Sequence, residues 1–228
     1  MNRVDIDDVI EEFIRGTPVL IHDSSSREDE TDIVVYAGKI DTDKIYLMRT
    51  LGGGLLCYAT TEKVTRALGI PFADEIYSNI PTLRPLTEKR LSYGDRPAFT
   101  IWVNHIEATT GIRDKDRALT IRKLHELTVK TINNSIEDAK RMLATEFQAP
   151  GHVPLLAARG LDKRRGHTEL SIALTEMGNA VPSVAFIEML DYGDRLPADK
   201  ARKLAEEKGF LFVEGSDIIE AYREWQGA

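Results

Sequence analysis

An acidic run near the amino terminus carries side chains suited to bind a cation. Residues 27–32 read Arg-Glu-Asp-Glu-Thr-Asp, and an apolar run follows directly. Glu28, Glu30 and Asp32 occupy alternate positions, so in an extended chain they point to one side, where like charges repel. Carboxylate oxygens with water suit Mg²⁺ or Mn²⁺, and Arg27 can bind a phosphate or a sugar oxygen. The run predicts either a solvated acidic loop or a divalent-cation site.

A second cluster of polar side chains precedes a predicted helix. Residues 164–169 read Arg-Arg-Gly-His-Thr-Glu. The free N–H groups and positive end of a helix N-terminus attract anions, and Gly166 would let a ligand approach the backbone closely. The segment therefore predicts a phosphate site. The alternative is that Thr168 caps the helix and the arginines are solvated. His167 fits that alternative poorly, because imidazole is also a metal ligand.

Two further residues stand where an acid–base group would be useful. His152 follows Pro-Gly at the entrance to an apolar run, so it is either a general base or an ordinary turn residue. Glu188 lies within the apolar run Ser-Val-Ala-Phe-Ile-Glu-Met-Leu. An acid among apolar neighbours costs stability unless it is paired or protonated. Glu188 is therefore either an acid–base residue or an edge position exposed to water.

Composition limits the class of protein. Of the 228 residues, 42% are hydrophobic and 29% are charged, so the chain can bury an ordinary core, and we expect one domain over residues 1–228. The net charge of −7 argues against nucleic acid as a partner. Cys57 is the only cysteine, which excludes an internal disulfide and favours a reducing interior. No apolar run approaches the roughly 20 residues that span a bilayer, so we expect a cytoplasmic protein without a membrane partner.

Hydrophobic spacing predicts helices and strands mixed along the whole chain. Helices are expected at 6–14, 42–49, 121–127, 135–146, 167–177 and 197–208, with a last one capped by Ser216. Strands are expected at 18–23, 33–37, 55–59, 98–105, 153–158, 183–190 and 210–213. In the strand at 98–105, the alternation places Thr100, Trp102 and Asn104 towards solvent. This mixture is typical of α/β or α+β proteins.

In their order along the chain, these motifs resemble one known family. The matching motifs are Arg-Glu-x-Glu-x-Asp at 27–32, Gly-Gly-Gly-Leu-Leu-Cys at 52–57, Thr-Thr-Gly-Ile at 109–112 with Asp116 and Arg117, Pro-Gly-His at 150–152, Arg-x-Gly-His-Thr-Glu at 164–169, and Glu188. From residue 6 to 225 the chain resembles 3,4-dihydroxy-2-butanone 4-phosphate synthase of riboflavin biosynthesis, in its stand-alone form. The resemblance implies a lyase with a single-domain α+β fold, a mixed sheet with helices packed on it. It also implies a homodimer with sites near the subunit interface and a requirement for Mg²⁺ or Mn²⁺.

The resemblance implies a role for each matching residue. Glu28 and His167 match metal ligands, so the two must lie together in the folded chain. His152 and Glu188 match residues regarded as essential for catalysis. Substrate contacts are expected from Arg27, Glu28, Asp32, Thr110, Arg164, Arg165, Gly166, His167, Thr168 and Glu188.

The implied reaction converts D-ribulose 5-phosphate into L-3,4-dihydroxy-2-butanone 4-phosphate and formate. Removing a proton beside a ketone makes an enediolate, whose charge needs a divalent cation and hydrogen-bond donors. The later steps need several proton transfers, for which carboxylates and histidines near the cation are suited. Two rival interpretations are another metal-dependent sugar-phosphate isomerase or aldolase, and a non-catalytic sugar-phosphate-binding module. An isomerase would release no formate.

Three segments carry further expectations. Residues 23–32 are predicted to be mobile until metal and substrate arrive, and then to close as a lid. Within them, Ser24-Ser25-Ser26 stands where family members usually carry more acid, which would change the closure or weaken metal binding. The segments 75–97 and 128–146 are longer than in compact family members and are expected to be surface elaborations.

Overall fold

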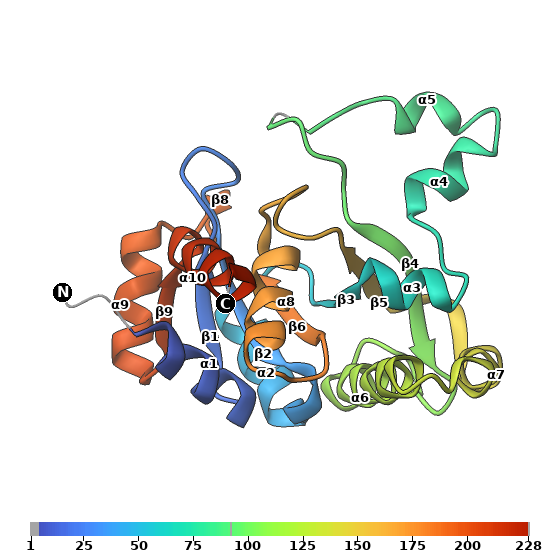
Figure 1. Cartoon of the computed structure of the whole chain (residues 1–228), viewed down its shortest axis with the longest axis horizontal. Coiled ribbons are helices and arrows are strands. Elements are labelled where there is room, and N and C mark those ends of the chain that lie inside the picture. Colours follow the sequence, from blue (N-terminus) through green and yellow to red (C-terminus); the bar gives the residue numbers. More distant parts are fainter. Residues whose placement is uncertain (1–4, 92, 228) are drawn as a thin grey trace.

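A computed structural model describes residues 5–91 and 93–227 of the chain (Figure 1). Its main strands are β1 (Val19–His22), β2 (Thr31–Tyr36), β3 (Cys57–Thr61), β4 (Phe99–His105), β5 (Phe147–Ala158), β6 (Ser183–Glu188) and β9 (Leu211–Glu214). They form one seven-stranded sheet in the order β4-β5-β3-β6-β2-β1-β9. The pairs β1–β9 and β3–β5 are parallel and the other pairs are antiparallel, so the sheet is mixed, as expected. Two short strands, β7 (Leu190–Asp191) and β8 (Asp194–Arg195), make a separate hairpin.

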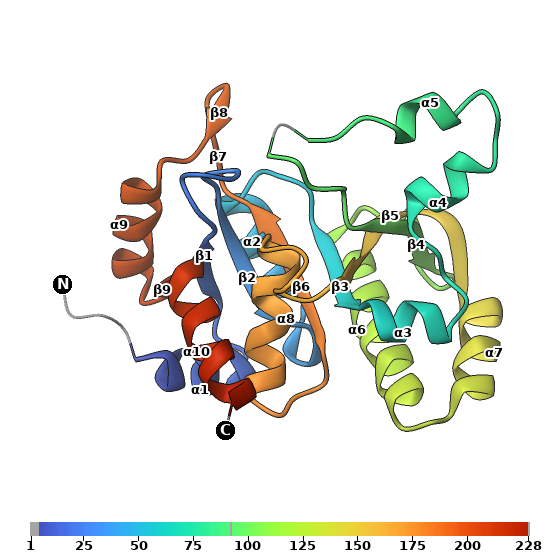
Figure 2. The same ribbon diagram turned by 45° about the horizontal axis from the view of Figure 1, so that its top comes forward.

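Helices cover both faces of the sheet. They are α1 (Ile6–Arg15), α2 (Thr42–Leu51), α3 (Glu62–Ala67), α4 (Ala73–Ser78), α5 (Arg84–Thr87), α6 (Asp114–Ile132), α7 (Ile136–Glu146), α8 (His167–Met177), α9 (Ala198–Lys208) and α10 (Gly215–Gly227). The helices α1, α8 and α10 lie on one face (Figure 2), and their apolar residues pack with Val34 and Phe186. On the other face, apolar residues of α2, α6, α7 and α9 pack with Ile33 and Ile187. Successive residues of β2 and β6 thus enter opposite layers, as strand geometry requires.

The structure confirms each predicted helix and strand within the α+β fold, but several ends differ. The helix predicted at 121–127 extends from Asp114 to Ile132. The sequence pattern missed its first turn because that turn is polar and carries no apolar period. Ser216 lies inside α10 and does not cap it, since that helix begins at Gly215. The three short helices α3, α4 and α5 were not predicted, because four to six residues are too few to display a period.

The predicted alternation in β4 is only partly correct. Trp102 is exposed, as expected, but Thr100 and Asn104 are buried. The Thr100 hydroxyl donates to the carbonyl of Leu155 at 2.7 Å, and Asn104 bonds with His152. These polar partners, together with register shifts along the β4–β5 pair, allow polar side chains to face inwards.

The segment between α3 and β4 leaves the sheet, forms α4 and α5, and returns towards the loop between β1 and β2 (Figure 2). Its last part, residues 93–97, contacts that loop through Tyr93 and Asp95. The expectation that residues 75–97 are only a surface elaboration is therefore wrong for this last part. Among the described residues, no helix is long and apolar enough to cross a membrane.

Candidate active site

Three elements meet where the predicted acidic run ends. The antiparallel pairs β1–β2 and β2–β6 place Asp32 beside Ile21 on one strand and Glu188 on the other. Asp32 alternates with Ile33, so its side chain enters the layer that holds α8. That helix begins at His167, and the imidazole lies directly over the start of β2. Sheet register and a helix start thus gather residues that are far apart in the sequence.

His167 joins the two motifs that the sequence singled out. Its Nδ1 atom is 3.7 Å from Oε2 of Glu28 and 3.5 Å from Oδ2 of Asp32. Its Nε2 atom is 3.1 Å from the carbonyl oxygen of Ile21 and 3.2 Å from that of Glu30. Carbonyl oxygens only accept hydrogen bonds, so Nε2 must carry a hydrogen. The Nδ1 atom is therefore the ring nitrogen that faces both carboxylates, which is the arrangement of a histidine ready to bind a cation.

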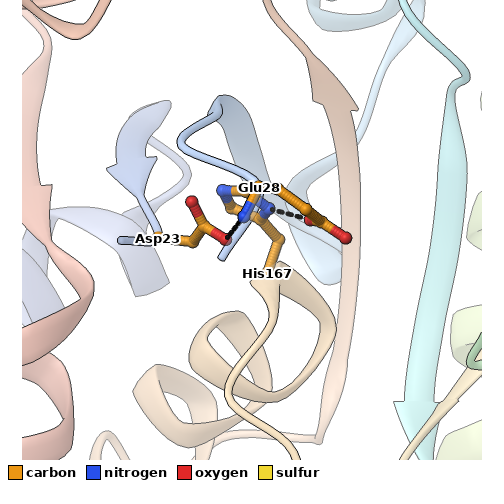
Figure 3. Close-up of side chains that lie close together, drawn as sticks. All are labelled: Asp23, Glu28 and His167. Carbon is orange, nitrogen blue, oxygen red and sulfur yellow. Dashed lines mark hydrogen bonds and ion pairs between the residues drawn. The ribbon is translucent and has the colours of Figure 1, made fainter. Parts of the chain in front are cut away.

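Asp23 completes this group and was missed by the sequence analysis. One ligand atom from each of Asp23, Glu28 and His167 lies within 4.8 Å of the others (Figure 3). However, the buried carboxylate of Asp23 already accepts hydrogen bonds from the backbone N–H groups of Glu28 and Glu30 and from Arg27. The Oδ1 atom of Asp32, in contrast, is buried and has no hydrogen-bond partner among the described residues. Asp32 thus has an oxygen atom that is free to contact a cation, whereas both carboxylate oxygens of Asp23 already hold the loop.

The charges in this cluster perturb one another. Burial disfavours the charged form of His167, but Asp32 and Glu28 outweigh it and raise the pKa of the imidazole to about 9. Burial also opposes ionisation of Glu28, yet its contacts with His167, Tyr93 and Arg27 lower its pKa to about 2. Burial raises the pKa of Asp32 well above its usual range, although His167 partly offsets this effect. The pKa of Glu30 is raised by burial and then by Glu28. Without a cation, the cluster contains more acid groups than it has positive charge to balance.

A pair of arginines forms the other half of the site. The Arg27 side chain contacts Asp23, Glu28 and Asp95, and the Arg164 side chain contacts Glu169 at 2.5 Å and lies near Asp95. Gly166 separates the two guanidinium groups. A Cβ atom there would lie 2.5 Å from Nη1 of Arg164 and 2.7 Å from Nη2 of Arg27, so a larger residue would push the guanidinium groups out of their present positions. Gly166 is also the N-cap of α8, whose first N–H groups have no intrahelical partner.

Glu188 lies at the end of β6, packed against the glycine run. Its Oε2 atom accepts a hydrogen bond from the N–H of Leu55 at 2.6 Å. A Cβ atom on Gly54 would lie 2.2 Å from that same oxygen. The glycine run therefore lets the backbone approach Glu188 closely. Cys57 is buried among apolar residues in the same layer.

A cavity of about 220 Å³ is lined by residues of the His167 cluster, by Arg164 and by Glu188. Its lining comes from Glu28, Asp32, Leu91, Tyr93, Pro97, Ala98, Phe99, Leu156, Arg164, His167, Thr168, Phe186 and Glu188. Tyr93 was not predicted: its hydroxyl donates to Glu28, and its ring lies under the guanidinium of Arg27 at 4.5 Å. The segment that carries it shows no periodicity or motif, so nothing in its residues signalled a role.

Three predicted site residues lie elsewhere in this chain. Arg165 lines a different cleft of about 510 Å³, beside Tyr222 and Arg223 of α10. Thr110 bonds to Asp116 through its N–H and its hydroxyl, ahead of α6. His152 is exposed and contacts Asn104. Within the described part of the chain, none of the three lines the cavity that holds Glu28 and His167.

Comparison with known protein families gives one match over almost the whole sequence. The family model described as 3,4-dihydroxy-2-butanone 4-phosphate synthase matches residues 7–221. A protein of that name from Archaeoglobus fulgidus is 40% identical over 234 residues, which cover 98% of this chain and 96% of the relative. Another, from Methanosarcina mazei, is 40% identical and covers 97% of this chain and 92% of the relative.

Two similar solved structures carry the same name. A crystal structure of 3,4-dihydroxy-2-butanone 4-phosphate synthase in its cation-free form superposes with a TM-score of 0.77 at 27% identity, and covers 98% of this chain and 99% of the other. A crystal structure of that enzyme in complex with two magnesium ions also has a TM-score of 0.77 at 27% identity, with 97% and 98% of the two chains covered.

Proposed function

This chain belongs to the 3,4-dihydroxy-2-butanone 4-phosphate synthase family, and on that basis we propose how its cavity converts D-ribulose 5-phosphate into L-3,4-dihydroxy-2-butanone 4-phosphate and formate. One observation carries the proposal. Nδ1 of His167 faces the carboxylates of Glu28 and Asp32 at 3.7 and 3.5 Å, next to two arginines that flank Gly166. A cation site thus adjoins an anion site, which suits a sugar phosphate that binds through both ends. The whole of residues 1–228 would serve as one catalytic domain.

The donor atoms fit a hard divalent cation such as Mg²⁺ or Mn²⁺. Glu28 and His167 would hold it, and the unpaired Oδ1 of Asp32 would then gain a positive partner. A bound divalent cation supplies Lewis-acid stabilisation of negative charge on the substrate oxygens. A relative of known structure holds two magnesium ions, which supports the same class of cation here.

The arginine pair would bind the phosphate. Arg27 and Arg164 bring guanidinium groups that match phosphate oxygens, and the start of α8 adds free N–H groups beside Thr168. The glycine at position 166 keeps this space open. Because the phosphate does not react, its binding energy would serve to fix the reacting carbons beside the carboxylates.

Proton transfer would fall to the carboxylates opposite the arginines. Burial raises the pKa of Asp32 well above its usual range, which favours a role for this group in taking up a proton during the reaction. Glu188 faces Asp32 across the β2–β6 pair and lines the same cavity. The two are therefore placed to exchange protons with neighbouring carbons and hydroxyls of one bound sugar.

The active form would be a homodimer that completes the site. His152 matches an essential residue of the family but lies outside the cavity of its own chain. Three large apolar side chains on its side of the molecule are exposed, namely those of Trp102, Ile106 and Ile112. A second copy covering this surface would bury them and bring His152 to the partner's cavity. Such an enzyme of riboflavin biosynthesis would work in the cytoplasm.

Formate release is the decisive test. Purified protein with Mg²⁺ and D-ribulose 5-phosphate is expected to release formate, whereas an isomerase or a binding module would release none.

The substitutions Glu28→Ala, His152→Ala and Glu188→Ala should each lower turnover by at least about a hundredfold, the usual effect of losing a positioned acid–base group or ligand. Removing Mg²⁺ with a chelator should abolish turnover reversibly. Full activity in all three variants would show that the site has been assigned wrongly.

A further inference from the structure

Asp95 occupies the centre of the arginine pair. Its Oδ2 atom is 3.2 Å from Nε of Arg27 and 3.9 Å from Nε of Arg164. Both arginine side chains are 9% exposed, whereas the Asp95 side chain is 26% exposed at the end of the segment that returns from α5. One carboxylate oxygen thus stands between two buried cations, at the position where an oxygen of a bound phosphate would be expected.

This carboxylate leaves part of the arginine pair unsatisfied. Nη2 of Arg27 and Nε of Arg164 are buried and have no hydrogen-bond partner among the described residues. A buried donor without an acceptor is costly, and a guanidinium group offers five donors in a fixed plane. The space beside both groups is kept open by Gly166. The pair therefore has room and donors for an anion with more oxygens than a carboxylate has.

We propose that Asp95 is an internal substitute for the substrate phosphate, so that this residue sets the affinity of the site for anions. The inference rests on the proposed function, in which Arg27 and Arg164 bind that phosphate. In the ligand-free chain, the carboxylate balances two buried positive charges that would otherwise repel each other. When a sugar phosphate arrives, its oxygens replace the Asp95 carboxylate and also reach the two unpaired donors.

The exchange favours phosphate over weaker anions. A phosphate group brings three strong acceptors, whereas Asp95 makes one bond with Arg27 and only a longer contact with Arg164. An anion that cannot satisfy the extra donors gains too little to displace a carboxylate already present on the chain. Asp95 would thereby raise the apparent dissociation constant of every anion by a similar factor, so that only anions that bind the arginine pair strongly would occupy the site.

Titration calorimetry with inorganic phosphate on the metal-free full chain tests this directly. In Asp95→Asn the amide keeps the shape but loses the charge, so phosphate is expected to bind about tenfold tighter than to the wild-type chain. Asp74→Asn is the matched control: Asp74 pairs with Arg96 on the same segment at 3.0 Å, and its loss changes net charge equally without touching the arginine pair. Asp74→Asn should bind phosphate as the wild-type chain does.

Two other results would overturn the inference. Weaker phosphate binding by Asp95→Asn would mean that Asp95 holds the arginines in place for the ligand, and unchanged binding would mean that it does not compete. Circular dichroism spectra and thermal unfolding would confirm that the variant is folded, and Asp95→Ser gives a second neutral side chain at this position.

If the wild-type chain released no formate, the proposed function would fail, but the phosphate titration would still decide the role of Asp95. If formate is released, the KM for D-ribulose 5-phosphate should fall in Asp95→Asn by a factor similar to that for phosphate.

Discussion

At the scale of single residues, the environment of His167 determines what the site can bind. Two carbonyl oxygens fix the hydrogen on Nε2, and two carboxylates face Nδ1. The same ring is therefore an ion-pair partner when the cation is absent and would become a ligand on the proposed binding of the cation. Because a cation can bind only the deprotonated nitrogen, cation binding must compete with protonation at this one atom.

The raised pKa of His167 predicts a pH-dependent stability of the metal-free chain. Since the pKa rises from 6.5 to about 9 on folding, the protonated ring stabilises the fold fully below pH 6.5, and this contribution is lost as the pH rises through 9. In wild-type protein with chelator, the free energy of unfolding should thus fall over this interval by up to a few kcal/mol more than in His167→Gln. Urea denaturation of both proteins at pH 6.5, 8 and 9.5 measures the difference. Parallel pH profiles for the two proteins would contradict the prediction.

At the scale of secondary-structure elements, the loop between β1 and β2 is held by contacts at several positions. Asp23, directly after β1, accepts hydrogen bonds from two of the loop's N–H groups. Further along, Asp29 contacts His22 at the end of β1 and Arg195 of the β7–β8 hairpin.

Closure of residues 23–32 as a lid stays a prediction. Hydrogen exchange in this segment should slow when Mg²⁺ and substrate are added, and equal exchange with and without them would refute closure.

Asp23 is expected to be the residue on which this loop depends most. In Asp23→Asn the buried Arg27 loses one of its carboxylate partners and the loop loses acceptors, so the free energy of unfolding should fall by about 3 kcal/mol. Mg²⁺ affinity should fall as well, because Glu28 lies in this loop and Asp23 holds its backbone N–H. The control is Asp138→Asn, which removes one side of an exposed Asp–Arg pair with Arg141 and should cost about 1 kcal/mol or less. Urea denaturation and Mg²⁺ titration measure the two effects, and equal losses in both variants would count against this role.

At the scale of the whole molecule, the sheet keeps two groups of proposed site residues apart within one chain. Glu28, Asp32 and His167 gather near β2 and β6, whereas His152 lies on β5, closer to the edge that β4 forms. A homodimer would bring these two regions together across an interface, with the exposed Trp102 at its edge. The proposed site would then be built from two chains, and each dimer would contain two such sites.

Mixing two inactive variants tests this arrangement. Glu28→Ala and His152→Ala are each expected to lose activity alone. If dimers exchange subunits at random, half of them become mixed, and each mixed dimer holds one site with both residues intact. Activity should therefore recover to about a quarter of the wild-type value. Formate release measured after joint unfolding and refolding gives the result, and the same procedure on each variant alone is the control. No recovery, with dimers present by light scattering, would place both residues in one chain's site.

The sequence alone determined most of the longer helices and strands and the chemical groups of this protein. Apolar periods predicted β1, β2, β6 and α8, and local motifs identified Glu28 and His167, because both kinds of signal lie within a few neighbouring residues. Only the tertiary structure decided which groups meet. Strand register joined Asp32 with Glu188, and the return of an aperiodic segment brought Asp95 to the arginines. Contacts between distant segments depend on how the whole chain packs, and no short stretch of residues encodes them.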